Sequence, residues 1–468
     1  MSNDILFQYT DDITELKLSY EFIDGELDLI RFVNLEKLDC SDNPITNIIN
    51  FPDSLIELNC SKTKIILNST TEIIYLDKKK EYENIFEKHI GKKLFEYFLL
   101  TGKLVDVESE DEIVEFISSD KKMLNLYNQL YTCDYKKIIF PSGLKKLVCK
   151  DMKCVNSSIN FFDDLPIGLI EFDCSYNKMT NLDNLPNSLI KLNCSNCFKL
   201  LELKNLPNSL IELNCSYSKI TNLDNLPNSL IKLDCSKTEI NSLDNLPNSL
   251  IELICFDTEI NSLDNLPNSL IKLDCSKTKI NFLDNLPNSL IELICFDTEI
   301  KSLDNLPNKL INLDCSKTKI NSLDNLPNSL IELSCYRSEI NSLDNLPNGL
   351  IKLDCSKTKI TQLNNLPNGL IELDCSKNKI TQLNNLPEIL EVLNCSGTKI
   401  KILENLPKKL KILECWSNKF ITKLNNLPDS LIELNIFNSR LNNRKIEKIK
   451  KLHPRLSLNI NTEKIKKK

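Results

Sequence analysis

The sequence is poor in the residues on which most enzyme chemistry depends. Its 468 residues include only eight glycines and two histidines, His89 and His453. Loops that cradle phosphate groups need glycine, and most acid–base and zinc sites use histidine. We therefore expect no enzymatic activity, no cofactor and no metal site.

Charge excess and long apolar runs are also missing. The net charge of -7 is too small to indicate a polyanionic partner, so we expect no nucleic acid. The longest dense apolar stretch, residues 95–100, is far too short to span a bilayer. The N-terminus has no basic segment followed by an apolar one, as a secretion signal would have. We expect an intracellular, cytoplasmic protein (in the host cytoplasm if viral) with no membrane partner; its oligomeric state stays open.

Cysteine, in contrast, is abundant, and its spacing reveals an internal repeat. Sixteen of the nineteen cysteines occupy one position of a twenty-residue unit that reads LIKLDCSKTEINSLDNLPNS over residues 230–249. We number its positions 1 to 20 from the first leucine. Fourteen consecutive units begin between Leu169 and Leu431. Weaker copies begin at Ile13, Leu35, Leu55 and Leu144.

The unit predicts a short strand followed by extended chain. Leu233 and Cys235 alternate with polar neighbours, which is the two-residue period of a strand with one buried face. Residues 240–249 lack helical spacing, and Pro247 excludes a helix interior. Stacked units would place their strands about 4.8 Å apart in a parallel sheet, and no unit should fold alone.

This unit resembles the leucine-rich repeat family, whose pattern LxxLxLxxNxL is matched by Leu210, Leu213, Cys215, Ser218 and Ile220. Its length and LP ending are similar to the short repeats of bacterial effectors and of giant-virus and amoebal proteins. The resemblance implies a leucine-rich repeat solenoid with a parallel β-sheet on the concave face and an extended, polyproline-like convex side. The resemblance is specific for the fold and says almost nothing about function.

Two departures from the family pattern concern the core. Cysteine replaces leucine at position 6, and threonine or serine usually replaces the family's asparagine at position 9. A threonine hydroxyl bonds fewer backbone groups than an asparagine amide, so each rung should be held slightly less firmly. The asparagine is retained at Asn43, Asn177, Asn378 and Asn418.

Four segments follow from the repeat boundaries. Residues 1–67 form an N-terminal cap with early repeats, 68–137 a helical insert, 138–442 the main array, and 443–468 a C-terminal cap with a basic tail. The insert has apolar residues at helical spacing and either packs passively beside the solenoid or acts as a docking module. The last segment predicts a capping helix and a short strand, because terminal repeats need polar caps.

Two regular columns have alternative interpretations. The cysteines could oxidise or bind metal, but a thiol at a leucine position is typical of inert core, and the single CxxC at Cys194 and Cys197 lacks a second ligand pair. The aspartates at position 15, such as Asp244, could line up for calcium, although the glycine-rich turns of calcium-binding solenoids are missing. Bonding of each carboxylate to turn N–H groups is favoured instead.

The predicted concave face alternates between two kinds of rung. One carries Lys232, Asp234 and Ser236, and the next carries Glu252 and Phe256, so that lysine and glutamate stand side by side. This pattern is explained either by recent duplication with internally neutralised charge, or by binding through exposed apolar patches. The aromatic series at position 7 is Phe256, Phe296, Tyr336, Trp416 and Phe437, predicted to face outward from the strand.

The leading hypothesis is a non-enzymatic protein–protein interaction scaffold that binds through this face. An alternative is an adaptor whose insert 68–137 recruits a complex, for example ubiquitin-ligase machinery, while the repeats select the target. An enzyme-linked effector is disfavoured because only about 26 residues follow the last repeat, and a purely structural role stays open. The predicted partner-binding residues are Phe256, Phe296, Tyr336, Trp416, Ile254 and Ile294.

Overall fold

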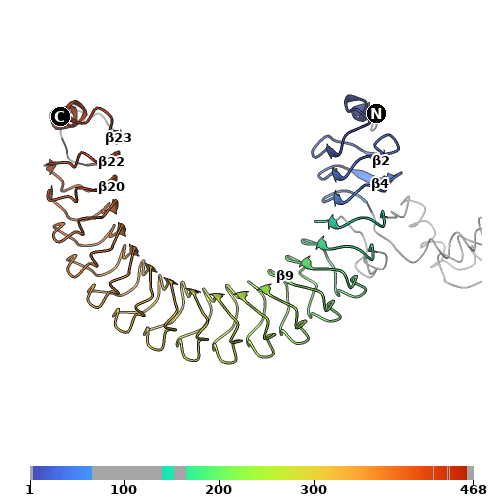
Figure 1. Cartoon of the computed structure of the whole chain (residues 1–468), viewed down its shortest axis with the longest axis horizontal. Coiled ribbons are helices and arrows are strands. Elements are labelled where there is room, and N and C mark those ends of the chain that lie inside the picture. The colour runs from blue at the N-terminus through green and yellow to red at the C-terminus, as the bar shows by residue number, and fades with distance from the viewer. Residues whose placement is uncertain are drawn as a thin grey trace, which may run out of the picture. The chain divides into compact units, whose positions relative to one another are not determined.

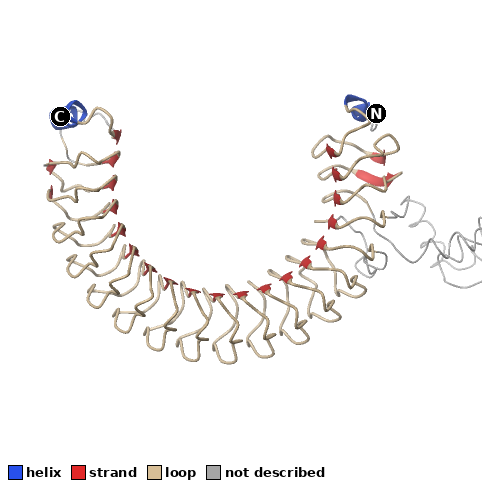
Figure 2. Cartoon of the chain, in the orientation of Figure 1, coloured by secondary structure: helices blue, strands red, loops and turns tan. Residues whose placement is uncertain are grey.

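The computed structural model describes residues 4–65, 140–151, 165–424, 426–439, 441 and 443–460. The helical insert predicted over 68–137 lies outside the described residues. The chain divides into two compact units, Met1–Lys219 and Ile220–Lys468. Within each unit, rungs stack with their short strands along the inner side of the curve and their loops along the outer side (Figures 1 and 2). The predicted solenoid is confirmed.

The first unit contains one parallel sheet in the order β1-β3-β5-β6-β7-β8-β9. The pair β2 and β4 forms a separate parallel ribbon outside this sheet, which the repeat pattern does not predict. All four weak copies found in the sequence contribute a strand to the sheet. The elements are η1 (Asp4–Gln8), β1 (Glu15–Lys17), β2 (Gly25–Asp28), β3 (Lys37–Asp39), β4 (Ile45–Ile49), β5 (Glu57–Asn59), β6 (Lys146–Val148), β7 (Glu171–Asp173), β8 (Lys191–Asn193) and β9 (Glu212–Asn214).

The second unit repeats the same arrangement, with its strands in the order β10 to β18, then β20, β22 and β23. The predicted C-terminal helix and strand are present as α5 and β23. The elements are β10 (Lys232–Asp234), β11 (Glu252–Ile254), β12 (Lys272–Asp274), β13 (Glu292–Ile294), β14 (Asn312–Asp314), β15 (Glu332–Ser334), β16 (Lys352–Asp354), β17 (Glu372–Asp374), β18 (Val392–Asn394), β19 (Ile402–Leu403), β20 (Ile412–Glu414), β21 (Lys423–Leu424), β22 (Glu433–Asn435), α5 (Asn443–Leu452) and β23 (Ser457–Asn459).

The strand of a typical rung, such as β10, is only three residues long because the chain turns sharply soon after it. In the rung 230–249, Lys237 at position 8 and Asn245 at position 16 adopt φ of 53° and 63°. This left-handed region is tolerated by asparagine and is costlier for lysine, by roughly 1–2 kcal/mol. Pro247 then accepts a hydrogen bond from the amide of Leu250, and this turn leads into the next strand. The outer side is extended chain and turns, as predicted.

The core of a rung is the stack of leucine, isoleucine and cysteine at positions 1, 4, 6, 11 and 14. In the rung 230–249 none of these five side chains is more than 2% exposed. Leu246 is half-buried at the edge of this core. Because each stack is covered by the rungs on either side, the side chains of the strand face are held in fixed register. Among the described residues, no helix combines the length and the apolar character that crossing a membrane requires.

Candidate functional site

Position 3 carries a row of alternating charges on the open face of the sheet. In the second unit, Lys232 and Lys272 each form an ion pair with a glutamate on the following strand, at 3.3 Å and 3.0 Å between Nζ and Oε2. Lys352 lies between two glutamates, with its Nζ 3.5 Å from Glu332 and 3.6 Å from Glu372. The predicted charge alternation is therefore present as ion pairs between neighbouring rungs.

Position 5 carries an aspartate whenever position 7 is a serine in the rungs from 230 to 376. In the rung 350–369, Asp354 Oδ1 accepts hydrogen bonds from the backbone amide of Ser356 at 2.9 Å and from its hydroxyl at 2.6 Å. The aspartate thus holds the turn that ends the strand. Where position 7 is aromatic in the same rungs, position 5 is Ile254, Ile294 or Ser334 instead. Positions 5 and 7 therefore change together.

The aromatic side chains at position 7 lie in this turn; Phe256, Phe296, Tyr336 and Trp416 are half-buried, whereas Phe437 is exposed. The ring of Phe256 has two lysine ammonium groups over it, Lys277 at 5.1 Å and Lys237 at 5.9 Å from its centroid. Lys317 lies 4.4 Å from the centroid of Phe296. Contacts of this kind contribute about 0.5–1 kcal/mol at exposed sites, and they fix the orientation of the rings.

A third contact between a lysine and an aromatic ring, Lys377 with Trp416, is possible because a glycine occupies position 8 of the rung between them. Lys377 Nζ lies 5.9 Å from the ring centroid of Trp416, although the two residues are two rungs apart. The intervening residue at position 8 is Gly397, which has no side chain and a φ of 67°. The glycine leaves space for the Lys377 side chain to extend past its rung to Trp416, a role that the sequence alone does not reveal.

The prediction that position 7 faces outward from a strand was wrong in one respect. The strand ends at position 5, and the left-handed residue at position 8 folds the chain back. Serine at position 7 is therefore buried, and the rings of Phe256, Phe296, Tyr336 and Trp416 are half-buried. Ile254 and Ile294 are also half-buried, on the sheet face. The structure does not test whether the six predicted residues bind a partner.

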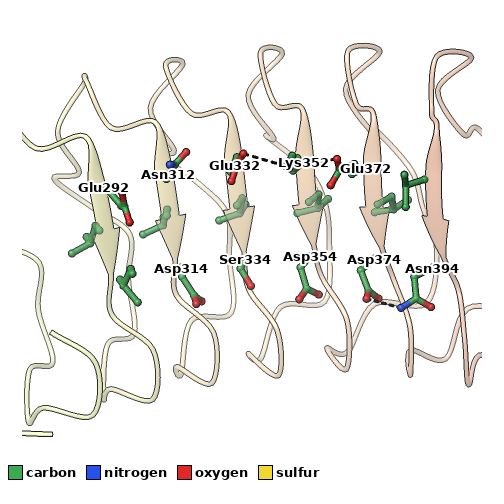
Figure 3. A pocket seen from close by; sticks show the side chains of 17 residues that line it. Glu292, Asn312, Asp314, Glu332, Ser334, Lys352, Asp354, Glu372, Asp374 and Asn394 are labelled. Atoms are coloured by element: carbon green, nitrogen blue, oxygen red, sulfur yellow. Dashed lines mark hydrogen bonds and ion pairs between the residues drawn. The ribbon is translucent and has the colours of Figure 1, made fainter. Parts of the chain in front are cut away.

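A groove lies on the strand face between β13 and β18, with a volume of about 450 Å³. Figure 3 shows two rows of side chains along it: position 3 from Glu292 to Glu372, and position 5 from Asp314 to Asn394. The lining holds six carboxylates and one lysine, which gives a formal charge of -6 + 1 = -5. Sequence reasoning missed this groove.

Comparisons with known proteins support the fold. No family model matches the sequence, and no curated protein matches it significantly. Among solved structures, YopM from Yersinia enterocolitica is 27% identical, with a TM-score of 0.60 over 92% of this chain and 79% of that one. YopM from Yersinia pestis, described as a leucine-rich effector protein, is 23% identical, with a TM-score of 0.57 over 84% of this chain and 100% of that one. A leucine-rich repeat protein of Leptospira interrogans is 18% identical, with a TM-score of 0.54 and coverage of 97% of each chain.

The chain is a leucine-rich repeat solenoid. Repeat proteins of this architecture generally use the extended inner surface of the array for binding.

The cysteine column of the leucine-rich repeats is buried core. Each described cysteine is buried, with a thiol side chain. Burial raises the pKa of the Cys255 thiol well above its ordinary value, with the neighbouring cysteines as a smaller cause. Cys197 of the CxxC pair occupies position 9, where its Sγ lies 3.5 Å from the carbonyl oxygen of Cys174. Among the residues that the structure describes, no cluster of three or more metal-ligating side chains occurs.

The aspartate column at position 15 is held by side chains, not by turn N–H groups as predicted. Asp264 accepts a hydrogen bond from the Ser262 hydroxyl at 2.6 Å and another from the Asn285 amide of the following rung at 2.8 Å. These two bonds lower the pKa of the Asp264 carboxyl. The prediction failed because the carboxylate reaches across to the next rung, where position 16 supplies an asparagine.

The amide of an asparagine at position 9 connects two rungs, whereas the hydroxyl of a threonine at this position donates to the cysteine carbonyl of its own rung. The Nδ2 of Asn378 donates to the carbonyl oxygen of Cys355 on the preceding rung at 2.8 Å, and its Oδ1 accepts from the Thr358 amide at 2.7 Å. In contrast, the hydroxyl of Thr238 donates to Cys235 within one rung at 2.7 Å. This difference agrees with the weaker hold expected of threonine.

Proposed function

We propose that this leucine-rich repeat solenoid is a non-enzymatic scaffold that binds a protein partner through the strand face of its second unit. One observation carries the proposal: the rungs between residues 230 and 349 differ from one another mainly on that face and in the turn that follows each strand. Positions 1, 4, 6, 11 and 14 are identical in all six rungs, whereas positions 3, 5, 7 and 8 change. A constant core with a varied face is what selective recognition of a partner requires.

The proposed contact residues are the six predicted from the sequence. Half-burial holds the four aromatic groups in place, and lysines lie over the rings of Phe256, Phe296 and Trp416, so these groups lose little side-chain entropy on binding. Aromatic anchors that are rigid and partly accessible are typical of the residues that contribute most to protein interfaces. The contact set is Phe256, Phe296, Tyr336, Trp416, Ile254 and Ile294.

The experiment replaces all four aromatic residues by serine and compares the partners captured from a lysate with those of the unmodified chain. Serine is the residue that most other rungs carry at position 7, so the variant is expected to fold. The matched control is Phe282→Ser, because Phe282 is 67% exposed at position 13, where neighbouring rungs carry serine. We expect the partner to be lost from the fourfold variant and kept by the control. An unchanged set of partners in both would contradict the proposal.

Two finer assignments accompany this proposal as predictions. One is the resemblance to the short LP-containing repeats of bacterial effectors and of giant-virus and amoebal proteins, which the 27% identity to YopM supports in part. The other is an intracellular site of action, to be checked by locating the tagged chain in fractionated cells.

A further inference from the structure

The charge alternation at position 3 is interrupted within the groove. Lysine alternates with glutamate along β10 to β13, but β14 carries Asn312 where the pattern requires lysine. Glu292 and Glu332 stand on either side of Asn312, and their lysine partners are on the far sides, at Lys272 and Lys352. Between Glu292 and Glu332, near the β13 end of the groove, position 3 therefore holds no cation.

Position 5 adds a second row of carboxylates to the same part of the face. Asp314, Asp354 and Asp374 follow one another on β14, β16 and β17, with only Ser334 between the first two (Figure 3). Within the described ranges, none of these three aspartates forms an ion pair. The pKa of Asp354 is raised, first by burial and then by the negative charges of Asp374 and Asp314, whereas the hydrogen bonds from Ser356 oppose the shift.

We propose that this acidic groove, from β13 to β18, docks an extended segment of the protein partner that carries lysine or arginine side chains. The inference rests on the proposed function and names the chemistry of the partner. Charge complementarity selects a cationic segment, because the lining carries six carboxylates and one lysine, and the three aspartates at position 5 form no ion pair among the described residues. The apolar side chains of Ile294 and Val392 line the two ends of the groove and admit the aliphatic parts of such a segment.

The dimensions of the groove favour an extended segment. Six strands at about 4.8 Å spacing give a length of about 24 Å, which about seven residues of extended chain would span. In an extended segment every second side chain points to the same side, so alternating lysines would all face the carboxylates.

The test measures binding of a fluorescein-labelled peptide of five Lys-Ser repeats to the full-length chain by fluorescence anisotropy at low ionic strength. The test variant is Asp314→Asn, Asp354→Asn and Asp374→Asn combined. Asparagine occupies position 5 at Asn394, where it also accepts a hydrogen bond from the following serine amide, so the fold should be kept. The matched control is Glu259→Gln, Glu299→Gln and Glu339→Gln, which changes the charge equally at exposed position 10.

We expect the unmodified chain and the control to bind alike, the aspartate variant to bind at least tenfold more weakly, and a Glu-Ser peptide not to bind. Added salt should weaken the binding. Equal binding by both triple variants, or equal binding of both peptides, would overturn the inference. So would self-association of the chain that the aspartate variant abolishes, because the occupant would then be a second copy. A lysate partner lost only from the aromatic variant would support the proposed function and refute this inference.

Discussion

The substitution Asn312→Lys would complete the charge alternation of the sheet face. The new side chain would lie between Glu292 and Glu332, as Lys352 lies between Glu332 and Glu372 at 3.5 Å and 3.6 Å. Lysine is also the residue that the rungs at 232 and 272 carry at this position. The variant should fold and should fill the site of the proposed cationic partner with a cation of its own.

The size of the effect follows from Coulomb's law. Position 3 on one strand and position 5 on its neighbours are diagonal, about 7–8 Å apart. Two unit charges about 8 Å apart interact by about 2 kcal/mol at an effective dielectric constant of about 20, and by about half of that in a groove open to water. A repulsion of about 1 kcal/mol weakens peptide binding about fivefold. The new ion pairs should change the unfolding free energy by only about 0–1 kcal/mol.

Peptide titration at two salt concentrations, with urea unfolding of the same samples, would check this prediction. Asn241→Lys is the matched control: Asn241 is exposed at position 12, and the rung that contains Lys301 has lysine there. Peptide binding that is as tight for Asn312→Lys as for the control at low salt would refute the electrostatic reasoning. If Asn312→Lys still bound the peptide more weakly than the control did at high salt, by the same factor as at low salt, that would also count against it. Screening should remove most of the repulsion that causes the difference.

Three further predictions concern the solenoid itself. Asn378→Thr should lower the unfolding free energy by about 1–2 kcal/mol, since it removes the bonds to Cys355 and to the Thr358 amide; urea unfolding unchanged from the parent would contradict it. Because burial raises the thiol pKa at Cys255, the cysteine column should not react with a thiol reagent at pH 8 until urea unfolds the chain, and prompt labelling of the folded protein would disprove this. The raised pKa of Asp354 means that its charge costs stability above the unfolded pKa of about 3.9; Asp354→Asn should therefore stabilise the chain at pH 7, with an advantage that disappears below about pH 4, as thermal unfolding across pH would show.

The rung itself could be predicted from the sequence because its determinants are local and repeated. The alternation at Leu233 and Cys235 determines the strand, and Pro247 excludes a helix on the outer side. The terminal helix α5 follows from its apolar spacing, with Ile446 and Ile449 buried. Each of these features depends on a few neighbouring residues and on the burial of one face.

The groove could not be located in this way, because it depends on which residues of different rungs stand side by side. Asn312 is unremarkable within its own rung and becomes informative only when position 3 is followed from strand to strand. The lysine contacts of Phe256 and Trp416 depend in the same way on side chains that reach into other rungs. Position 3 compared from rung to rung in the sequence shows that Asn312 stands where lysine is expected. The same comparison does not show that Asp354 is partly buried.

The coupling of positions 5 and 7 explains why the acidic groove forms where the two-rung alternation ends. From residue 230 to 349 every acidic rung is followed by one whose position 5 is Ile254, Ile294 or Ser334, so carboxylates are separated by a neutral side chain. From Asp354 onward the aspartate–serine pair occurs in consecutive rungs, and Asp354 and Asp374 become direct neighbours. Each aspartate accepts a hydrogen bond from the serine two residues later and so stabilises the turn of its own rung. When two consecutive rungs both use this pair, their aspartates stand side by side with like charges. That repulsion is tolerated by the folded chain, and a cationic partner would relieve it.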